Sequence, residues 1–161
     1  MRRGIEIIML VIFGGFLLQA ALEDHGTKTV RRYLWWGAGT AAFALLVLLG
    51  PPGLPVLESL TIYAGLQFFF FSRMYGRADC HAFFCCGVLL HAYGGNLKTC
   101  LWHMLVTFFF LGVVQLFKKN VNGRGNLKVP VALVPYLSLS LFPCLAMLLG
   151  AGRGLPVTLI R

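Results

Sequence analysis

Long apolar runs separated by short polar segments are the feature that most constrains how this chain can fold. In the first run, Ile5 to Leu22, the polar interruptions are Glu6 and Gln19. As a helix rising ~1.5 Å per residue, it is long enough to cross most of a hydrocarbon core of ~30 Å. Over the whole chain, 58% of residues are hydrophobic and 12% are charged, whereas a soluble domain has about a quarter charged residues. The sequence therefore predicts an all-α integral membrane protein.

Apolar runs and turn signals together predict about six transmembrane helices in a single membrane-embedded domain spanning residues 1–161. The expected helices cover residues 5–22, 33–50, 56–74, 79–93, 97–117 and 129–150. The turn at residues 51–55 contains three prolines, which end a helix because proline cannot donate a backbone hydrogen bond. The fourth expected helix is short for a membrane span.

The net charge of +9 comes from basic residues clustered between the apolar runs. Loops after the first, third and fifth expected helices hold nine Lys and Arg residues, and the opposite face holds five. The positive-inside rule therefore predicts that these three loops are cytoplasmic and that both termini lie outside. Such loops suit an anionic membrane surface, so the expected partner is the lipid bilayer and not a nucleic acid. The five cysteines form no C-x-x-C pair, and neither a metal site nor a cofactor is expected.

Asp24 and Asp79 are the two aspartates of the chain, and each lies where an apolar run meets a charged loop. Two expected spans separate them, so both should emerge on the same face of the membrane. A carboxylate near membrane depth is costly and tends to have a function. Two carboxyls that share one proton can supply a general base and a general acid together. The alternative is that both are ordinary loop residues beside arginines.

Both aspartates lie in segments that resemble the motifs of the type IV prepilin peptidases, which are membrane aspartic proteases. In that family one aspartate is followed six residues later by Ile-Pro-Asn, and the second lies in a G-x-G-D-x-K motif. Here Asp24 is followed six residues later by Val30, with Arg31 and Arg32 in place of Pro-Asn. Residues 129–135, with prolines at 130 and 135, are similar to the start of the family's last helix.

The second motif corresponds to residues 76–81, Gly-Arg-Ala-Asp-Cys-His. Gly76 and Asp79 match the family pattern, while Ala78 replaces the second glycine and His81 replaces the lysine. His81 is a candidate to tune Asp79, or an interfacial histidine bonded to water. Arg77 is a candidate partner for an aspartate, although we favour a role as an interfacial anchor.

The resemblance implies an aspartic endopeptidase that removes the cytoplasmic leader of type IV prepilins or pseudopilins. It implies Asp24 and Asp79 as the catalytic residues, supported by the motif residues just described. It also implies a multi-pass protein of the inner (plasma) membrane with its active site facing the cytoplasm. Larger family members carry an insertion with paired C-x-x-C motifs that is associated with N-methylation. This chain lacks both, so we expect a compact form that acts only as a peptidase.

Two other classes of function fit the same residues. A small proton-coupled transporter or channel component would use Asp24, Asp79 and Glu58 as a proton path. A catalytically silent membrane scaffold would tolerate the departures at Ala78 and His81.

The helix positions also lead to expectations for individual side chains. Asp79 lies near the positive N-terminal end of the fourth expected helix, so we expect it to ionise more readily than Asp24. His91 and His103 lie on apolar helices and are expected to be buried polar partners. The phenylalanine runs at residues 68–71 and 108–110 are expected to face lipid or to pack between helices.

Overall fold

The protein is a bundle of α-helices in the computed structural model, which describes residues 2–27, 29–122 and 132–151. Within these residues there is no β-strand. The helices are α1 (Arg2–Thr27), α2 (Arg32–Leu49), α3 (Leu54–Gly65), α4 (Arg77–Ala92), α5 (Leu97–Asn122) and α6 (Val134–Ala151). After α3 the helical path continues through a π-helical turn, Leu66–Phe70, and a 3-10 turn, Phe71–Arg73.

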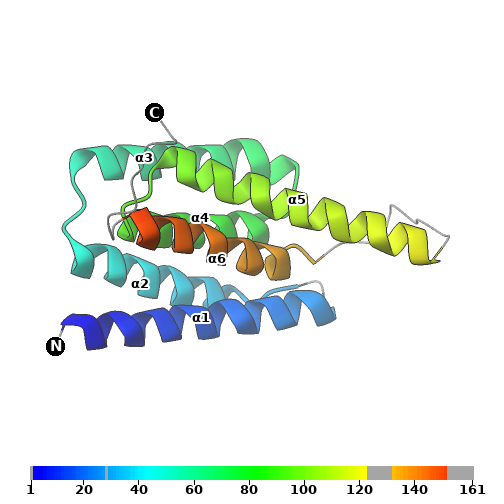
Figure 1. The fold of residues 1–161 in the computed structure, drawn as a ribbon, viewed down its shortest axis with the longest axis horizontal. Helices are drawn as coiled ribbons and strands as arrows, with labels where there is room; N and C mark the ends of the chain where they lie inside the picture. The colour runs from blue at the N-terminus through cyan, green and yellow to red at the C-terminus, as the bar shows by residue number, and fades with distance from the viewer. Residues whose placement is uncertain (1, 28, 123–131, 152–161) are drawn as a thin grey trace.

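The short helix α4 is the centre of the bundle. It packs against α2, α3, α5 and α6, and most of its side chains after Asp79 are buried. Helix α1 lies beside α2 and also contacts α6, while α5 packs against α6 and α3 and extends beyond the other helices (Figure 1). The bundle therefore surrounds α4 on several sides.

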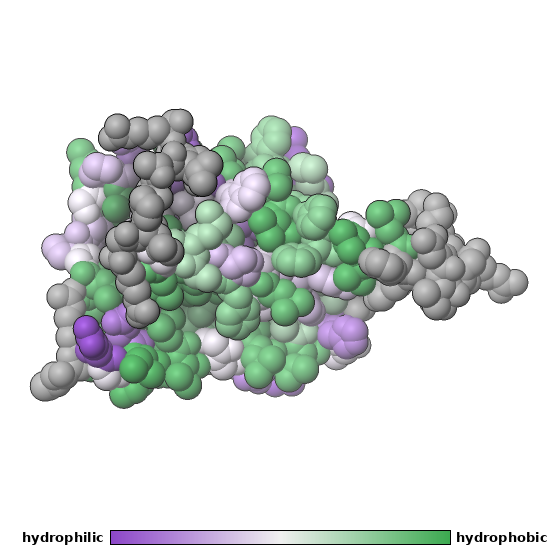
Figure 2. All heavy atoms as spheres, in the orientation of Figure 1, coloured by the Kyte–Doolittle hydropathy of each residue, from purple (hydrophilic) through white to green (hydrophobic). Residues whose placement is uncertain are grey.

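Four of the described helical segments are long and apolar enough to cross a membrane: 3–27, 32–49, 54–73 and 97–116. Large apolar side chains are exposed on the outside of the bundle, among them Val11, Phe69 and Phe142. Apolar residues, in green, cover much of the face shown in Figure 2. An apolar exterior of this kind is stable in lipid and not in water. The fold is that of a helical membrane protein, as predicted. The central helix α4 has 16 residues, which agrees with its expected shortness.

Some helix boundaries differ from those expected. Helix α1 continues past Gly26 to Thr27, so Asp24 lies in its last turn and not in a loop. Helix α6 begins at Val134 in the described part of the chain, and the expected start of this helix, with Pro130, lies outside the described residues. Pro135 is the second residue of α6, where a missing N–H is tolerated because the first turn has no intrahelical acceptors.

Candidate active site

Three helix ends meet at one end of the bundle: the C-terminal end of α1 and the N-terminal ends of α4 and α6. They lie toward the right of Figure 1, opposite the N-terminus of α1. This arrangement follows from the alternating direction of the helices. It brings Asp24 on α1 and Asp79 on α4 to the same end of the molecule, as the sequence predicted.

Asp24 is buried, with 8% of its surface exposed. Its Oδ2 accepts a hydrogen bond of 3.0 Å from the backbone N–H of Val134, the first residue of α6. The first N–H groups of a helix have no partner within the helix, and its N-terminal end carries positive potential. Asp24 therefore supplies an acceptor for the start of α6 and joins α1 to α6.

Asp79 is partly buried in the first turn of α4. Gly76 caps this helix: its carbonyl accepts the N–H of Asp79 at 3.1 Å, and its backbone also hydrogen-bonds the Asp79 side chain. Burial and then the nearby charge of Asp24 raise the pKa of Asp79 to about 6, and the Gly76 hydrogen bond opposes this shift.

Asp79 was expected to ionise more readily than Asp24 because of its place at the N-terminal end of α4, but its own pKa is raised. The N-terminal end of α4 does favour a charge there, but burial and the neighbouring Asp24 outweigh it and raise the pKa of Asp79. Asp24, in contrast, holds a backbone N–H donor from α6. The two carboxyls therefore differ in their surroundings: the pKa of Asp79 is raised by burial, and Asp24 accepts a hydrogen bond from the backbone of α6.

A tyrosine that is hydrogen-bonded to a buried glutamine lies beside Asp79. The phenol of Tyr75 donates a 2.6 Å hydrogen bond to Oε1 of Gln67, a fully buried residue of the π-helical turn. Burial is the main cause that raises the pKa of Tyr75 well above its usual value, and the charge of Asp79 adds to it. Tyr75 also stacks on Phe71, with ring centroids 5.8 Å apart. A π-helical turn often marks a functional site. Here the turn directs the buried amide of Gln67 toward Tyr75, the residue before Gly76.

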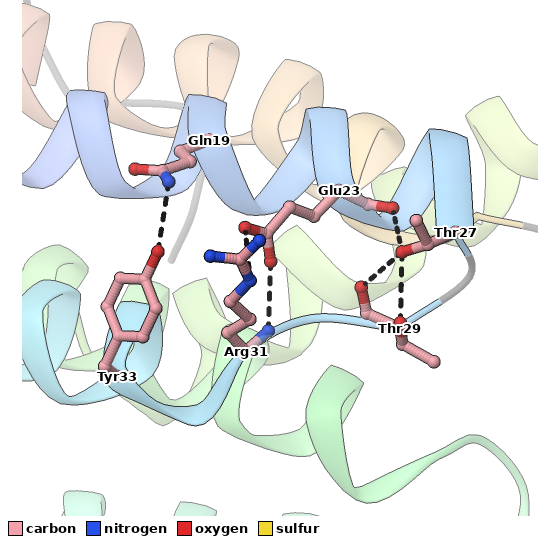
Figure 3. A network of polar contacts seen from close by, with 6 residues as sticks. All are labelled: Gln19, Glu23, Thr27, Thr29, Arg31 and Tyr33. Carbon is pink, nitrogen blue, oxygen red and sulfur yellow. Dashed lines mark hydrogen bonds and ion pairs between the residues drawn. The ribbon is translucent and has the colours of Figure 1, made fainter.

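A polar network fixes the connection between α1 and α2 immediately after Asp24 (Figure 3). Glu23 accepts the backbone N–H of Arg31 at 3.1 Å and forms an ion pair with its guanidinium at 3.4 Å. Gln19 donates to the hydroxyl of Tyr33 at 3.2 Å, which ties α1 to the first turn of α2. The backbone and side-chain contacts of Arg31 with Glu23 therefore hold the connection that follows Asp24.

Arg77, Ala78 and His81 are the remaining motif residues. Gly76 hydrogen-bonds the carboxyl of Asp79 through its backbone, whereas these three have other contacts. Arg77 is exposed, and no ion pair joins it to an aspartate among the described residues. Its expected role as an interfacial anchor stays a prediction. His81 is exposed; its Nδ1 lies 2.6 Å from the Arg77 carbonyl and its ring packs edge-on against Phe68. Ala78 lies with Arg77 and His81 along a groove beside α4.

The other side-chain expectations can be compared with the structure. His91 hydrogen-bonds Ser59 at 2.7 Å and His103 lies 3.1 Å from the Leu137 carbonyl, so both are buried polar partners as expected. Phe69 and Phe109 are exposed on the apolar exterior. In the part of the chain that the structure describes, no group of three or more His, Cys, Asp or Glu side chains comes together as a metal site.

The sequence analysis missed three features of the site: the Val134 N–H, Gln67 and Tyr75. Gln67 carried a signal, because it is the single amide in the apolar run before Arg73. The Val134 N–H carried none, since a backbone donor has no side-chain signature and its role depends on how α6 packs against α1.

Comparison of the chain with protein-family models, with curated proteins and with solved structures found no match.

Proposed function

We propose that the protein is a membrane aspartic endopeptidase that removes the cytoplasmic leader of type IV prepilins or pseudopilins. The observation that carries the proposal is the pair of carboxyls: Asp24 and Asp79 come from different helices and lie at the same end of the bundle, and the charge of Asp24 helps to raise the pKa of Asp79. The order and spacing of the two aspartate motifs support the same reading.

The chemistry follows from the two carboxyls. Asp24, as the base, takes a proton from a water molecule whose oxygen attacks the carbonyl carbon of the scissile peptide. Asp79, as the acid, gives its proton to the carbonyl oxygen, which forms a tetrahedral gem-diol. When the C–N bond breaks, the proton held by Asp24 passes to the leaving amine and a hydroxyl proton returns to Asp79. Both carboxyls then have their starting protonation.

The location of the pair suits a substrate that is partly in the membrane. Both aspartates lie near the ends of helices, where a polypeptide crosses from the bilayer to water. The excess of Lys and Arg in the loops at this end favours a cytoplasmic orientation in the plasma membrane. A basic leader in the cytoplasm joined to a hydrophobic helix would present its junction at this depth.

A proton-coupled transporter has less support from the positions of the acids. A proton path needs acidic groups distributed through the bilayer depth. Glu58 is exposed near the start of α3, and Glu6 accepts a hydrogen bond from Tyr93, both at the end of the bundle away from the aspartates. The acidic side chains of the described residues therefore lie at the two ends of the bundle, and none lies midway along it.

Cleavage by purified protein reconstituted in lipid tests the proposal. A synthetic peptide with a basic leader followed by an apolar helix serves as substrate. Asp24→Asn and Asp79→Asn should each abolish cleavage, while Glu58→Gln, a matched change of an exposed acid at the opposite end, should leave the rate unchanged. A silent scaffold would give no cleavage with any variant, and cleavage that survives either aspartate change would exclude the two-carboxyl mechanism.

A further inference from the structure

A groove of about 1220 Å³ runs between α2 and α3, with α4 as its floor. The α4 residues that line it repeat at helical spacing: Arg77, Ala78, His81, Phe84, Cys85 and Val88. Asp79 lies on a neighbouring face of the same helix. The groove is therefore a separate site beside the carboxyl pair.

The direction of the three helices gives the groove two chemically different ends. Arg32 at the start of α2 and Arg77 at the start of α4 lie at the end near the aspartates. Phe43 and Leu57 lie toward the other end and are apolar. From Arg77 to Val88 the helix rises ~16 Å, at ~1.5 Å per residue. This is about half of a ~30 Å hydrocarbon core, the depth of one lipid leaflet.

The charges along the groove all have one sign. Its lining contains two arginines and a histidine, and it contains no aspartate or glutamate. Arg31, the neighbouring arginine, is paired with Glu23 and does not line the groove. Basic pockets between membrane helices bind anionic lipid head groups, because the charge is attracted to phosphate at the interface.

Trp35 supplies an independent observation. It lines the groove and is 6% exposed, and within the described residues its indole N–H is buried without a hydrogen-bond partner. A buried N–H that lacks an acceptor is unfavourable. An oxygen-rich ligand in the groove would supply that acceptor, whereas an empty apolar groove would not.

We propose that this groove binds an anionic phospholipid, with the phosphate at Arg32 and Arg77 and one acyl chain along the apolar part between α2 and α3. The length of the groove fits one leaflet, its charge fits the head group, and an ester or phosphate oxygen can accept from Trp35. The inference does not depend on peptidase activity.

Fluorescence of Trp35 measures this binding directly. Trp36→Phe and Trp102→Phe remove the other two tryptophans, so that the remaining reporter is the one buried beside the groove. The protein is reconstituted in phosphatidylcholine vesicles that contain increasing fractions of chain-brominated phosphatidylglycerol or, in a matched series, chain-brominated phosphatidylcholine. Bromine quenches tryptophan on contact, and unlabelled phosphatidylglycerol should reverse the quenching.

The same degree of Trp35 quenching should need a mole fraction of brominated phosphatidylglycerol roughly 25-fold lower than that of brominated phosphatidylcholine. This ratio corresponds to about fivefold for each arginine. The double variant Arg32→Gln, Arg77→Gln should lose this preference, and Ala64→Phe, which fills the groove, should reduce quenching by both lipids. Arg73→Gln, an exposed arginine outside the groove lining, is the matched control and should change nothing.

Equal quenching by the two lipids would overturn the proposal, as would an equal loss of preference in Arg73→Gln. Quenching by a spin-labelled hydrophobic peptide but by neither lipid would show a peptide site instead. Mass spectrometry of lipids retained by the unaltered protein gives a measurement that needs no variant: enrichment of anionic lipid is expected, and retention in proportion to the bulk membrane would contradict the proposal.

Discussion

Asp79 has a carboxyl group in an environment that disfavours its charged form. Burial and the charge of Asp24 raise its pKa to about 6 from a usual value of 3.8. Because the folded state then holds a proton that the unfolded state releases, stability is highest below pH ~4 and is lost as pH rises through ~6. The loss is at most ~3 kcal/mol at ~1.4 kcal/mol per pKa unit, reduced by the remaining solvent exposure.

Asp79→Asn removes this penalty while keeping the shape of the side chain. We expect the variant to be more stable than the wild type at pH 7.5 and equally stable near pH 4, measured as thermal unfolding midpoints in detergent. Glu58→Gln, which alters an exposed acid, should show no such pH-dependent gain. An Asp79→Asn midpoint below that of the wild type at pH 7.5 would mean that the carboxylate is stabilised in the folded protein.

At the scale of elements, Asp24 joins the end of α1 to the start of α6 through the Val134 N–H. Asp24→Asn keeps a side-chain oxygen that can accept this hydrogen bond, whereas Asp24→Ala leaves a buried donor unpaired. An unpaired buried N–H costs ~1–3 kcal/mol, so the alanine variant should unfold at a clearly lower temperature than the asparagine variant. Equal midpoints for the two variants would show that the contact does not hold α6 in place.

The hydrogen bond and ion pair between Glu23 and Arg31 also act between elements, because they hold the connection from α1 to α2 that follows Asp24. Exposed ion pairs contribute at most ~1 kcal/mol, so Glu23→Ala should reduce leader cleavage by at most about fivefold without abolishing it. Thr29→Ala, in the same connection but outside the Glu23 contacts, serves as the control in the same assay. A complete loss of cleavage in Glu23→Ala would give Glu23 a direct catalytic role that the geometry does not predict.

For the whole molecule, the alternation of helices puts the aspartates at one end of the bundle and Glu58 at the other. A single cysteine introduced by Thr29→Cys should react with a membrane-impermeant maleimide from the cytoplasmic side, and one introduced by Glu58→Cys from the opposite side. The native cysteines in the described residues are buried, which limits background labelling. Labelling of both positions from the same side would contradict the topology.

The apolar runs were sufficient to predict the helices and the placement of both aspartates at the same end, since an even number of spans between them returns the chain to the same face. The exact helix ends were less predictable. Helix α1 continues past Gly26 because tertiary contacts at Glu23 and Asp24 hold its last turn. The pKa of Asp79 depends on burial, which appears only when the helices pack together, so its position at a helix N-terminus did not predict that this pKa is raised.

The central claim is that Asp24 and Asp79 act as one catalytic unit. The most direct measurement compares kcat/KM for leader cleavage in Asp24→Asn, Asp79→Asn and the double variant against the wild type in the same lipid. Residues that act as a unit have non-additive effects, so each single change should reduce the rate as far as the double change. Losses that add, or cleavage that persists in either single variant, would show that the two carboxyls do not work together.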